Sequence, residues 1–346
     1  MKVPIQGGHK MIEASSFSLA ITNSVKFDIL IDSDAHDEIS EAIAKHTYAF
    51  PNAFQLLPDL IPVNSKVLDL GAHIGTFSLF AAALGHTLLA VEASPDNSVL
   101  LEASVSRNRF DNLTVVSVAV SNRPAMLEFI QAGPYGFVAN PSQRTPAISV
   151  PGVTVDELLA SLNWRNVDII KMDIEGSEVA AIEGMANLLS APKAPMILYE
   201  SNGHTLNFFG ETPNSLMAAL EAFGFRCYLI QANQLIPVQS SELQPECNVD
   251  CLAAKQLPGH ASWPIRSPLT KPEVIEKIIT TCSYPGNGIR AYVGRALARP
   301  EAAYLLDNPH IREVLETLKR DPKVEVQEAA AWYDSRSVVD NDAPHY

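Results

Sequence analysis

From residue 66 onward, short apolar runs that read as strands alternate with segments that read as helices. This alternation is typical of a mostly parallel sheet with helices on both faces. We therefore predict an α/β fold built on a seven-stranded, mostly parallel, Rossmann-like sheet, whose last two strands form an antiparallel edge. The strands are expected at residues 66–70, 87–92, 113–120, 167–173, 196–200, 225–230 and 248–253.

The chain before and inside this segment departs from the alternation. Residues 17–31 alternate apolar and polar side chains around a turn at 22–24, which predicts a β-hairpin, and a short polar helix is expected over 36–46. Residues 121–153 carry short β-like runs and many turn residues, so we expect an insertion beside the sheet.

The last part of the chain has a helical pattern. Thr270 and Glu273 form a capping box, and two later apolar stripes have helical spacing. The region is faintly similar to a HEAT-type repeat, but the match covers one repeat at best, and a plain helical bundle is favoured. The stripes are Ile311, Val314, Leu315 and Leu318, and Val326, Ala329, Ala330 and Tyr333. The predicted parts are a hairpin and helix extension (1–49), the α/β domain (50–255), a proline-rich linker (256–270) and a small all-α domain (271–346).

Composition excludes several classes of function. The formal net charge of −14 argues against binding nucleic acid through its phosphates. No apolar run reaches the ~18 residues needed to cross a membrane, and the first residues lack the apolar core of a secretory signal. A cytoplasmic protein is therefore expected. The cysteines form no C-x-x-C pair and read as core thiols; they are Cys227, Cys247, Cys251 and Cys282.

The stretch VLDLGAHIGTFSL, residues 67–79, reads as a strand that turns through glycines into a helix. In open parallel sheets ligands bind beyond the carboxyl ends of the strands, and Gly71 and Gly75 let the backbone approach such a ligand closely. Glu92 ends the next strand, where an acid can accept hydrogen bonds from a ribose diol. A nucleoside ligand is favoured over a plain tight turn. NAD stays open, but the G-x-G-x-x-G loop for its pyrophosphate is missing.

Six segments together resemble the FkbM-type methyltransferases, which are class I enzymes dependent on S-adenosylmethionine (SAM). The resemblance covers residues 50–254, and the helical tail lies outside it. The family usually has Asn where this chain has His73, which bears on how the methionine end of SAM is held. The segments are VLDLGAHIGTFSLFAA, AVEASPDN, VVSVAVSN, VTVDELL, VDIIKMDIEGSEVAAIEGM and MILYESNG.

The resemblance implies a SAM site along these segments. Asp69 and the backbone of the glycine loop would hold the amino-acid part, and the helix N-terminus after Gly75 could favour its carboxylate. Glu92 would accept the ribose hydroxyls, and Asp173 would point at the methionine amine or the transferring methyl. The implied cofactor-binding residues are Asp69, Gly71, His73, Gly75, Thr76, Glu92, Ala93, Ser94, Asn97, Ala119, Ser121 and Asp173.

Methyl transfer from a sulfonium is an in-line displacement to which an enzyme contributes chiefly position. A hydroxyl acceptor also needs a base within hydrogen-bonding reach. Glu178 is one candidate, but a carboxylate at a helix start also has the structural role of favouring the helix dipole. His204 is expected in a loop, where a solvated histidine without function is the alternative. The catalytic candidates are Asp173, Glu175, Glu200 and His204.

Oxygen-bearing side chains also end two neighbouring predicted strands. Asp173, Glu200 and Asn202 could converge on Mg²⁺, which prefers oxygen ligands, and catechol-type methyltransferases place similar groups at strand ends. The spacing Glu-Ser-Asn differs from the adjacent pair of those enzymes. We therefore do not favour a metal, and expect these groups to bind the cofactor amine and acceptor hydroxyls.

The function predicted from the sequence is SAM-dependent O-methylation of a small metabolite or a glycan-like acceptor. N-methylation, a non-catalytic SAM-binding or scaffold protein and, more weakly, an NAD-dependent oxidoreductase remain open. The insertion is expected to cover the acceptor. The C-terminal helices are expected to dock on the α/β domain or to form a homodimer, and no nucleic acid or membrane partner is expected.

Overall fold

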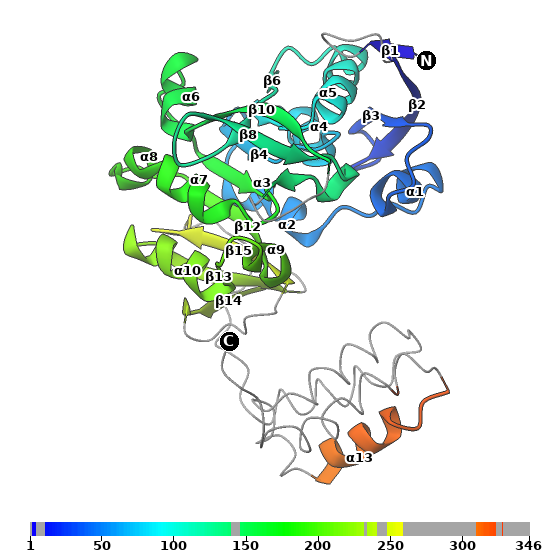
Figure 1. Ribbon diagram of the computed structural model, residues 1–346, viewed down its shortest axis with the longest axis vertical. Helices are drawn as coiled ribbons and strands as arrows, with labels where there is room; N and C mark the ends of the chain where they lie inside the picture. The colour runs from blue at the N-terminus through cyan, green and yellow to red at the C-terminus, as the bar shows by residue number, and fades with distance from the viewer. Residues whose placement is uncertain are drawn as a thin grey trace. The chain divides into compact units, whose positions relative to one another are not determined.

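The computed structural model describes residues 2–4, 11–139, 146–231, 234–240, 248–258, 309–322 and 327. The chain divides into two units, Met1–Ser267 and Pro268–Tyr346 (Figure 1). None of the helices in the described ranges is long and apolar enough to cross a membrane.

The first unit is built on a central sheet with the order β14-β13-β15-β12-β11-β4-β5-β6. The five strands from β12 to β6 are parallel, whereas β15 is antiparallel to both of its neighbours, and β14 is antiparallel to β13. Buried parallel strands explain the nearly continuous Val, Ile and Leu runs. The strands are β4 (Lys66–Leu70), β5 (Thr87–Val91), β6 (Leu113–Val116), β11 (Ile169–Met172), β12 (Met196–Asn202), β13 (Arg226–Gln231), β14 (Gln234–Val238) and β15 (Asn248–Ala254).

The predicted α/β class, parallel sheet and antiparallel edge are confirmed, with two corrections. An eighth strand, β14, adds to the seven predicted, and its Pro237 is tolerated because β14 lies at the sheet edge. The single strand predicted over 113–120 is wrong. The chain leaves the central sheet after β6, and Ala119–Val120 form β7 in a different sheet.

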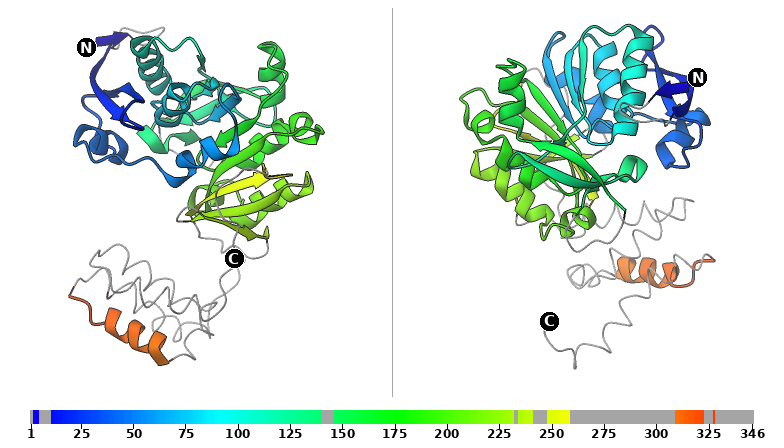
Figure 2. Two further views of the ribbon diagram at one scale, coloured as in Figure 1. Left: turned by 180° about the vertical axis from the view of Figure 1, so that it is seen from behind. Right: turned by 45° about the horizontal axis from the view of Figure 1, so that its top comes forward.

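Helices cover both faces of the central sheet (Figures 1 and 2). Their apolar sides contribute to two separate core clusters, one on each face. The first face carries α2 (Asn52–Gln55), α3 (Leu57–Leu60), α4 (Thr76–Ala83) and α5 (Pro95–Asn108). The second face carries α6 (Val155–Ser161), α7 (Glu178–Gly184), α8 (Ala186–Ser190) and α10 (Pro213–Ala222).

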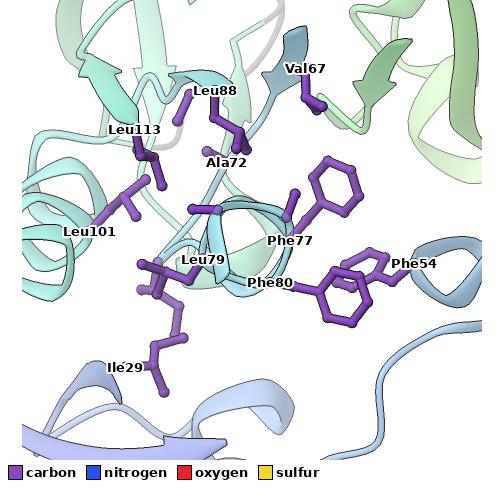
Figure 3. Packing of buried hydrophobic residues seen from close by; sticks show 14 of the residues in the cluster. Ile29, Phe54, Val67, Ala72, Phe77, Leu79, Phe80, Leu88, Leu101 and Leu113 are labelled. Atoms are coloured by element: carbon purple, nitrogen blue, oxygen red, sulfur yellow. The ribbon is translucent and has the colours of Figure 1, made fainter. Parts of the chain in front are cut away.

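Helix α4, which follows the glycine loop, is buried along almost its whole length. Figure 3 shows it surrounded by side chains from the sheet, α5, α2 and β3 (Lys26–Asp32). The ring of Phe54 lies 4.9 Å from that of Phe77 and 5.8 Å from that of Phe80, measured between centroids. The helix begins at Gly75, whose φ is +95°, and a Cβ there would lie 2.2 Å from Leu101 Cδ1. This packing fixes the position of the glycine loop relative to the sheet.

The predicted N-terminal hairpin and helix are confirmed. Strand β1 (Lys2–Pro4), β2 (Met11–Ala20) and β3 form a three-stranded sheet, followed by α1 (Glu38–Ala44). Asn108 of α5 accepts the Asp28 N–H at 2.7 Å and donates to the Asp28 carbonyl at 2.6 Å. Phe27 and Ile29 belong to the core cluster that contains α4. The extension is therefore packed into the same unit as the sheet.

The predicted insertion forms a sheet of its own, with the order β7-β10-β8-β9. In this article it is called the insertion sheet. It consists of β7 (Ala119–Val120), β8 (Ala125–Ile130), β9 (Phe137–Val138) and β10 (Ile148–Val153), with a 3-10 turn at Gly133–Tyr135. A short helix, α9 (Gly203–Asn207), follows β12.

In the second unit the structure describes one helix, α13 (Pro309–Leu318). Ile311, Leu315 and Leu318 are buried and Val314 is half-buried, which confirms the apolar stripe predicted there. The Thr270 capping box and the second predicted stripe lie outside the described residues, as does nearly all of the predicted linker.

Candidate active site

A cavity of about 330 Å³ opens at the carboxyl ends of the parallel strands. Gly71 and Glu92 line it after β4 and β5, and Asp173 and Glu200 line it at the ends of β11 and β12. This is the edge at which open α/β sheets bind ligands. The site predicted from the glycine loop and the one predicted from the acidic strand ends therefore share one cavity.

The glycine loop packs directly against the end of β11. Gly71 has φ +80°, and a Cβ there would lie 1.8 Å from the carbonyl oxygen of Asp173. The N–H groups of Gly71 and Ala72 both donate to the Val91 carbonyl at 3.0 Å. A side chain at position 71 would therefore clash with backbone, which leaves glycine as the residue that fits.

Glu92 connects the loop to the start of α5. Its carboxylate accepts the His73 N–H at 2.7 Å and the Ser94 N–H at 2.8 Å. Burial raises the pKa of Glu92, and these two hydrogen bonds partly oppose the rise. Burial also lowers the pKa of His73 to about 4, so its ring is neutral at pH 7. The Asn97 side chain also hydrogen-bonds Glu92, and because a carboxylate has about four acceptor sites, acceptor capacity remains for a ligand in the cavity.

Not all of the implied cofactor residues line the cavity. Asp69 is fully buried behind it, where its carboxylate accepts the Ser78 hydroxyl at 2.6 Å. The N–H of Asn97 donates to the Ser94 hydroxyl at 3.4 Å, which caps α5. Those that line it are Gly71, His73, Thr76, Glu92, Ala93, Asn97, Ala119 and Asp173; those that do not are Asp69, Gly75, Ser94 and Ser121.

Lys171 is a site residue that sequence reasoning missed. It lies opposite Asp69 in the register of β11 with β4, and its Nζ is 3.6 Å from Asp69 Oδ1 and 3.3 Å from Asp173 Oδ2. Nζ also donates to the Gly71 carbonyl at 3.0 Å. Burial lowers the pKa of Lys171, but Asp173 and Asp69 outweigh it and the pKa is raised overall. The available signal was a lysine inside the buried strand IIKM, where a charge needs a partner.

Three of the predicted catalytic residues meet at one end of the cavity. Carboxylate oxygens of Asp173, Glu175 and Glu200 all lie within 4.8 Å of one another, and we call these three residues the acidic cluster. Asp250 lines the same cavity and lies opposite Glu200 in the register of β12 with β15. Burial, followed by repulsion from Asp173, raises the pKa of Glu175 to about 8 and that of Glu200 to about 7.

Glu178 supports the loop that carries Glu175. Its carboxylate accepts the Ile174 N–H at 3.1 Å, and burial raises its pKa to about 7. It is not among the residues that line the cavity. Glu175 itself has φ +52°, a conformation that non-glycine residues adopt infrequently. The position of Glu178 favours the structural role that was considered for it.

The expected loop position of His204 is wrong, because β12 runs directly into α9. Asn202 caps this helix by accepting the His204 N–H at 3.1 Å. The His204 ring is exposed, lies edge-on to Phe208 at 4.9 Å and is not among the cavity-lining residues. Asn202 is not among the cavity-lining residues, and the residue whose carboxylate lies with those of Asp173 and Glu200 is Glu175.

Other lining residues come from segments that the motifs did not reach. Tyr48 and Phe54 precede β4, and Gly133, Gly136 and Val138 belong to the insertion. The Asn97 amide donates to the Gly133 carbonyl at 3.5 Å. No local pattern connects these residues with the glycine loop, because only the folded chain brings them together.

Residues 69–227 match the family model described as the Methyltransferase FkbM domain. A search of the curated proteins finds no match. Among solved structures, a precorrin-6y C5,15-methyltransferase from Geobacter metallireducens is 13% identical, with a TM-score of 0.35 over 59% of this chain and 87% of that chain.

Two further solved structures are similar at the same level. A TehB-like SAM-dependent methyltransferase from Corynebacterium glutamicum is 13% identical, with a TM-score of 0.35 over 63% of this chain and 94% of that one. A SAM-dependent methyltransferase from Agrobacterium tumefaciens is 12% identical, with a TM-score of 0.36 over 71% of each chain. Similarities at this level do not bear on the function of the chain.

Proposed function

We propose that the protein transfers the methyl group of SAM to a hydroxyl of a small metabolite or a glycan-like acceptor, because residues 69–227 match the methyltransferase FkbM family model. The observation that carries this proposal is the cavity itself. The glycine loop and Glu92 line it together with Asp173, Glu175 and Glu200. Cofactor and acceptor can therefore meet in one space.

The cofactor end of the cavity suits a nucleoside with an amino-acid tail. Glu92 is held by two backbone N–H groups and has lone pairs left for the ribose diol. Ala119 lines the wall where the adenine would lie, and Gly71 keeps the backbone open toward the methionine part. Asp69 supports this end from behind, through Ser78 and Lys171.

The acceptor end supplies carboxylates for the proton of the hydroxyl. The sulfonium is already an activated leaving group, so position contributes most of the acceleration. As the acceptor oxygen attacks the methyl carbon, the carbon–sulfur bond breaks and the hydroxyl proton must leave. Glu200, whose pKa is about 7, is partly ionised near neutral pH and can take it, whereas Glu175, whose pKa is about 8, becomes available as a base at higher pH.

The proposal is tested in two steps with the full-length protein. The midpoint temperature of thermal unfolding should rise with SAM and S-adenosylhomocysteine and stay unchanged with NAD, because a bound ligand stabilises the folded state. Methyl-labelled SAM is then incubated with fractionated metabolite extract, and the labelled product is identified by NMR. We expect the labelled methyl group of the product to be bonded to oxygen, as a methoxy group. A labelled N-methyl product would contradict the hydroxyl acceptor, and stabilisation by NAD alone would contradict the cofactor.

A further inference from the structure

The acidic cluster brings more negative charge into the cavity than its one lysine can balance. Lys171 pairs with Asp173 at 3.3 Å and with Asp69 at 3.6 Å. Within the part of the chain that the structure describes, no ion pair involves Glu175 or Glu200. Asp250 adds a further carboxylate to the same wall of the cavity. When Glu175 and Glu200 are ionised, they therefore lack a counterion of their own.

A second observation concerns Glu175 alone. Only 9% of its surface is exposed, and its Oε2 atom is buried without a hydrogen-bond partner among the described residues. A carboxylate oxygen that has left water without gaining a partner is unfavourable unless a ligand satisfies it. Because Glu175 lines the cavity, that ligand can reach it from there.

The geometry points to a divalent-cation site formed by Asp173, Glu175 and Glu200 at the acceptor end of the cavity. All of its donors are carboxylate oxygens, which suit Mg²⁺, Mn²⁺ or Ca²⁺ rather than metals that prefer nitrogen or sulfur. Two oxygens on opposite sides of a cation bound at about 2.0–2.6 Å lie about 4–5 Å apart. The ligand atoms lie within 4.8 Å of one another, so their spacing admits such an ion.

The inference concerns binding and stands apart from methyl transfer. If the proposed function holds, a hydroxyl that approaches a bound divalent cation has a lowered pKa. A carboxylate oxygen that does not touch the cation remains available to receive the proton. The site differs from the grouping expected from the sequence, because Asn202 caps α9 and Glu175 takes its place.

The test is a titration of the full-length protein with Mn²⁺, after removal of metals with EDTA, with free Mn²⁺ measured by electron paramagnetic resonance. We expect one saturable site from which Mg²⁺ displaces Mn²⁺. Glu175→Gln and Glu200→Gln should each weaken Mn²⁺ binding by about tenfold or more. Asp250→Asn is the matched control, because it removes a charge from the same cavity but none of the three ligands. It should weaken binding by less than about threefold, since solvent and salt screen its charge.

Three results would overturn the site. The first is that the native protein shows no saturable Mn²⁺ binding in the millimolar range. The second is that Asp250→Asn weakens Mn²⁺ binding as much as Glu175→Gln does. The third is that S-adenosylhomocysteine displaces Mn²⁺. The last would show that the carboxylates bind the ammonium group of the cofactor instead. Thermal unfolding curves of the metal-free variants identify any variant that fails to fold. The titration of the native protein tests the site even if a variant has to be discarded. SAM and acceptor are absent from the direct titration, so its failure is distinct from failure of the proposed function.

Discussion

Glu92 shows how one side chain can serve both the fold and a ligand. It fastens the glycine loop to the start of α5 through the N–H groups of His73 and Ser94. Because these hydrogen bonds already hold the Glu92 carboxylate in one position, binding a ribose diol costs little side-chain entropy, which favours binding. Lys171 likewise connects two segments, because its Nζ donates to the Gly71 carbonyl in the glycine loop and pairs with Asp173 at the end of β11.

At this scale we predict that Glu92→Ala weakens SAM binding by roughly 1.5–3 kcal/mol, the range for hydrogen bonds to a charged group. Part of the loss will come from the two backbone N–H groups that lose their acceptor. Isothermal titration calorimetry measures the change. The control is Glu102→Ala, an exposed acid on α5, for which we expect no change. An unaltered affinity in Glu92→Ala would remove the ribose assignment.

At the scale of elements, the insertion sheet is attached on two sides. The ring of Phe137 in β9 stacks on Phe208, just after α9, with centroids 5.9 Å apart and planes inclined by 23°. Tyr135 reaches α1, where its hydroxyl donates to Glu38 at 3.4 Å. The neighbouring Gly136 and Val138 line the cavity. These contacts hold the insertion beside the cavity, as expected of a segment predicted to cover the acceptor.

Shortening residues 131–145 to a tight turn is predicted to lower acceptor turnover and to leave SAM affinity unchanged. Phe137→Ala is a more selective change, because Gly133 also contacts Asn97. Loss of a ring pair worth about 0.5–1.5 kcal/mol should loosen β9 from α9 and reduce turnover several-fold. Tyr135→Phe, which keeps the ring, is the control. Label transfer and SAM calorimetry are compared for each variant, and equal losses in both would indicate misfolding instead of gating.

At the scale of the whole molecule, the second unit raises the question of how a small helical segment buries its apolar face. In α13, Ile311, Leu315 and Leu318 are buried while most of the remaining described positions face solvent. A segment of this size is small for an independent core. Tyr292, Trp332 and Tyr333, the large side chains expected to make its contacts, lie outside the described residues. Docking or dimerisation through the tail therefore stays a prediction.

Truncation after Ser262 is predicted to lower the melting temperature or to change the oligomeric state, which light scattering gives as the particle mass divided by the chain mass. The physical reason is that a segment of this size is small for an independent core, so it is expected to gain stability by packing on another part of the chain or on a second copy. Differential scanning fluorimetry and light scattering on both proteins provide the comparison. If the stability, the oligomeric state and the activity all stay the same, the tail is an independent module.

The sequence by itself determined the features that depend on neighbours along the chain. The alternation of strands and helices, the turn at Gly71 and Gly75, the acid that ends β5 and the stripe of α13 all follow from local patterns. Period-two and period-3.6 burial and the φ freedom of glycine act over a few residues. These features can therefore be predicted from one sequence without knowledge of strand order.

The tertiary structure alone decided which of these features meet. Strand β15 lies antiparallel between β12 and β13, which places Asp250 opposite Glu200. The parallel register of β11 with β4 places Lys171 beside Asp69. Glu175 turns into the cavity from a loop whose backbone has an uncommon positive φ. Strand order and register are set by packing between residues far apart in the chain, so no local pattern encodes that Glu200 meets Asp173 and Glu175 or that Lys171 lies beside Asp69.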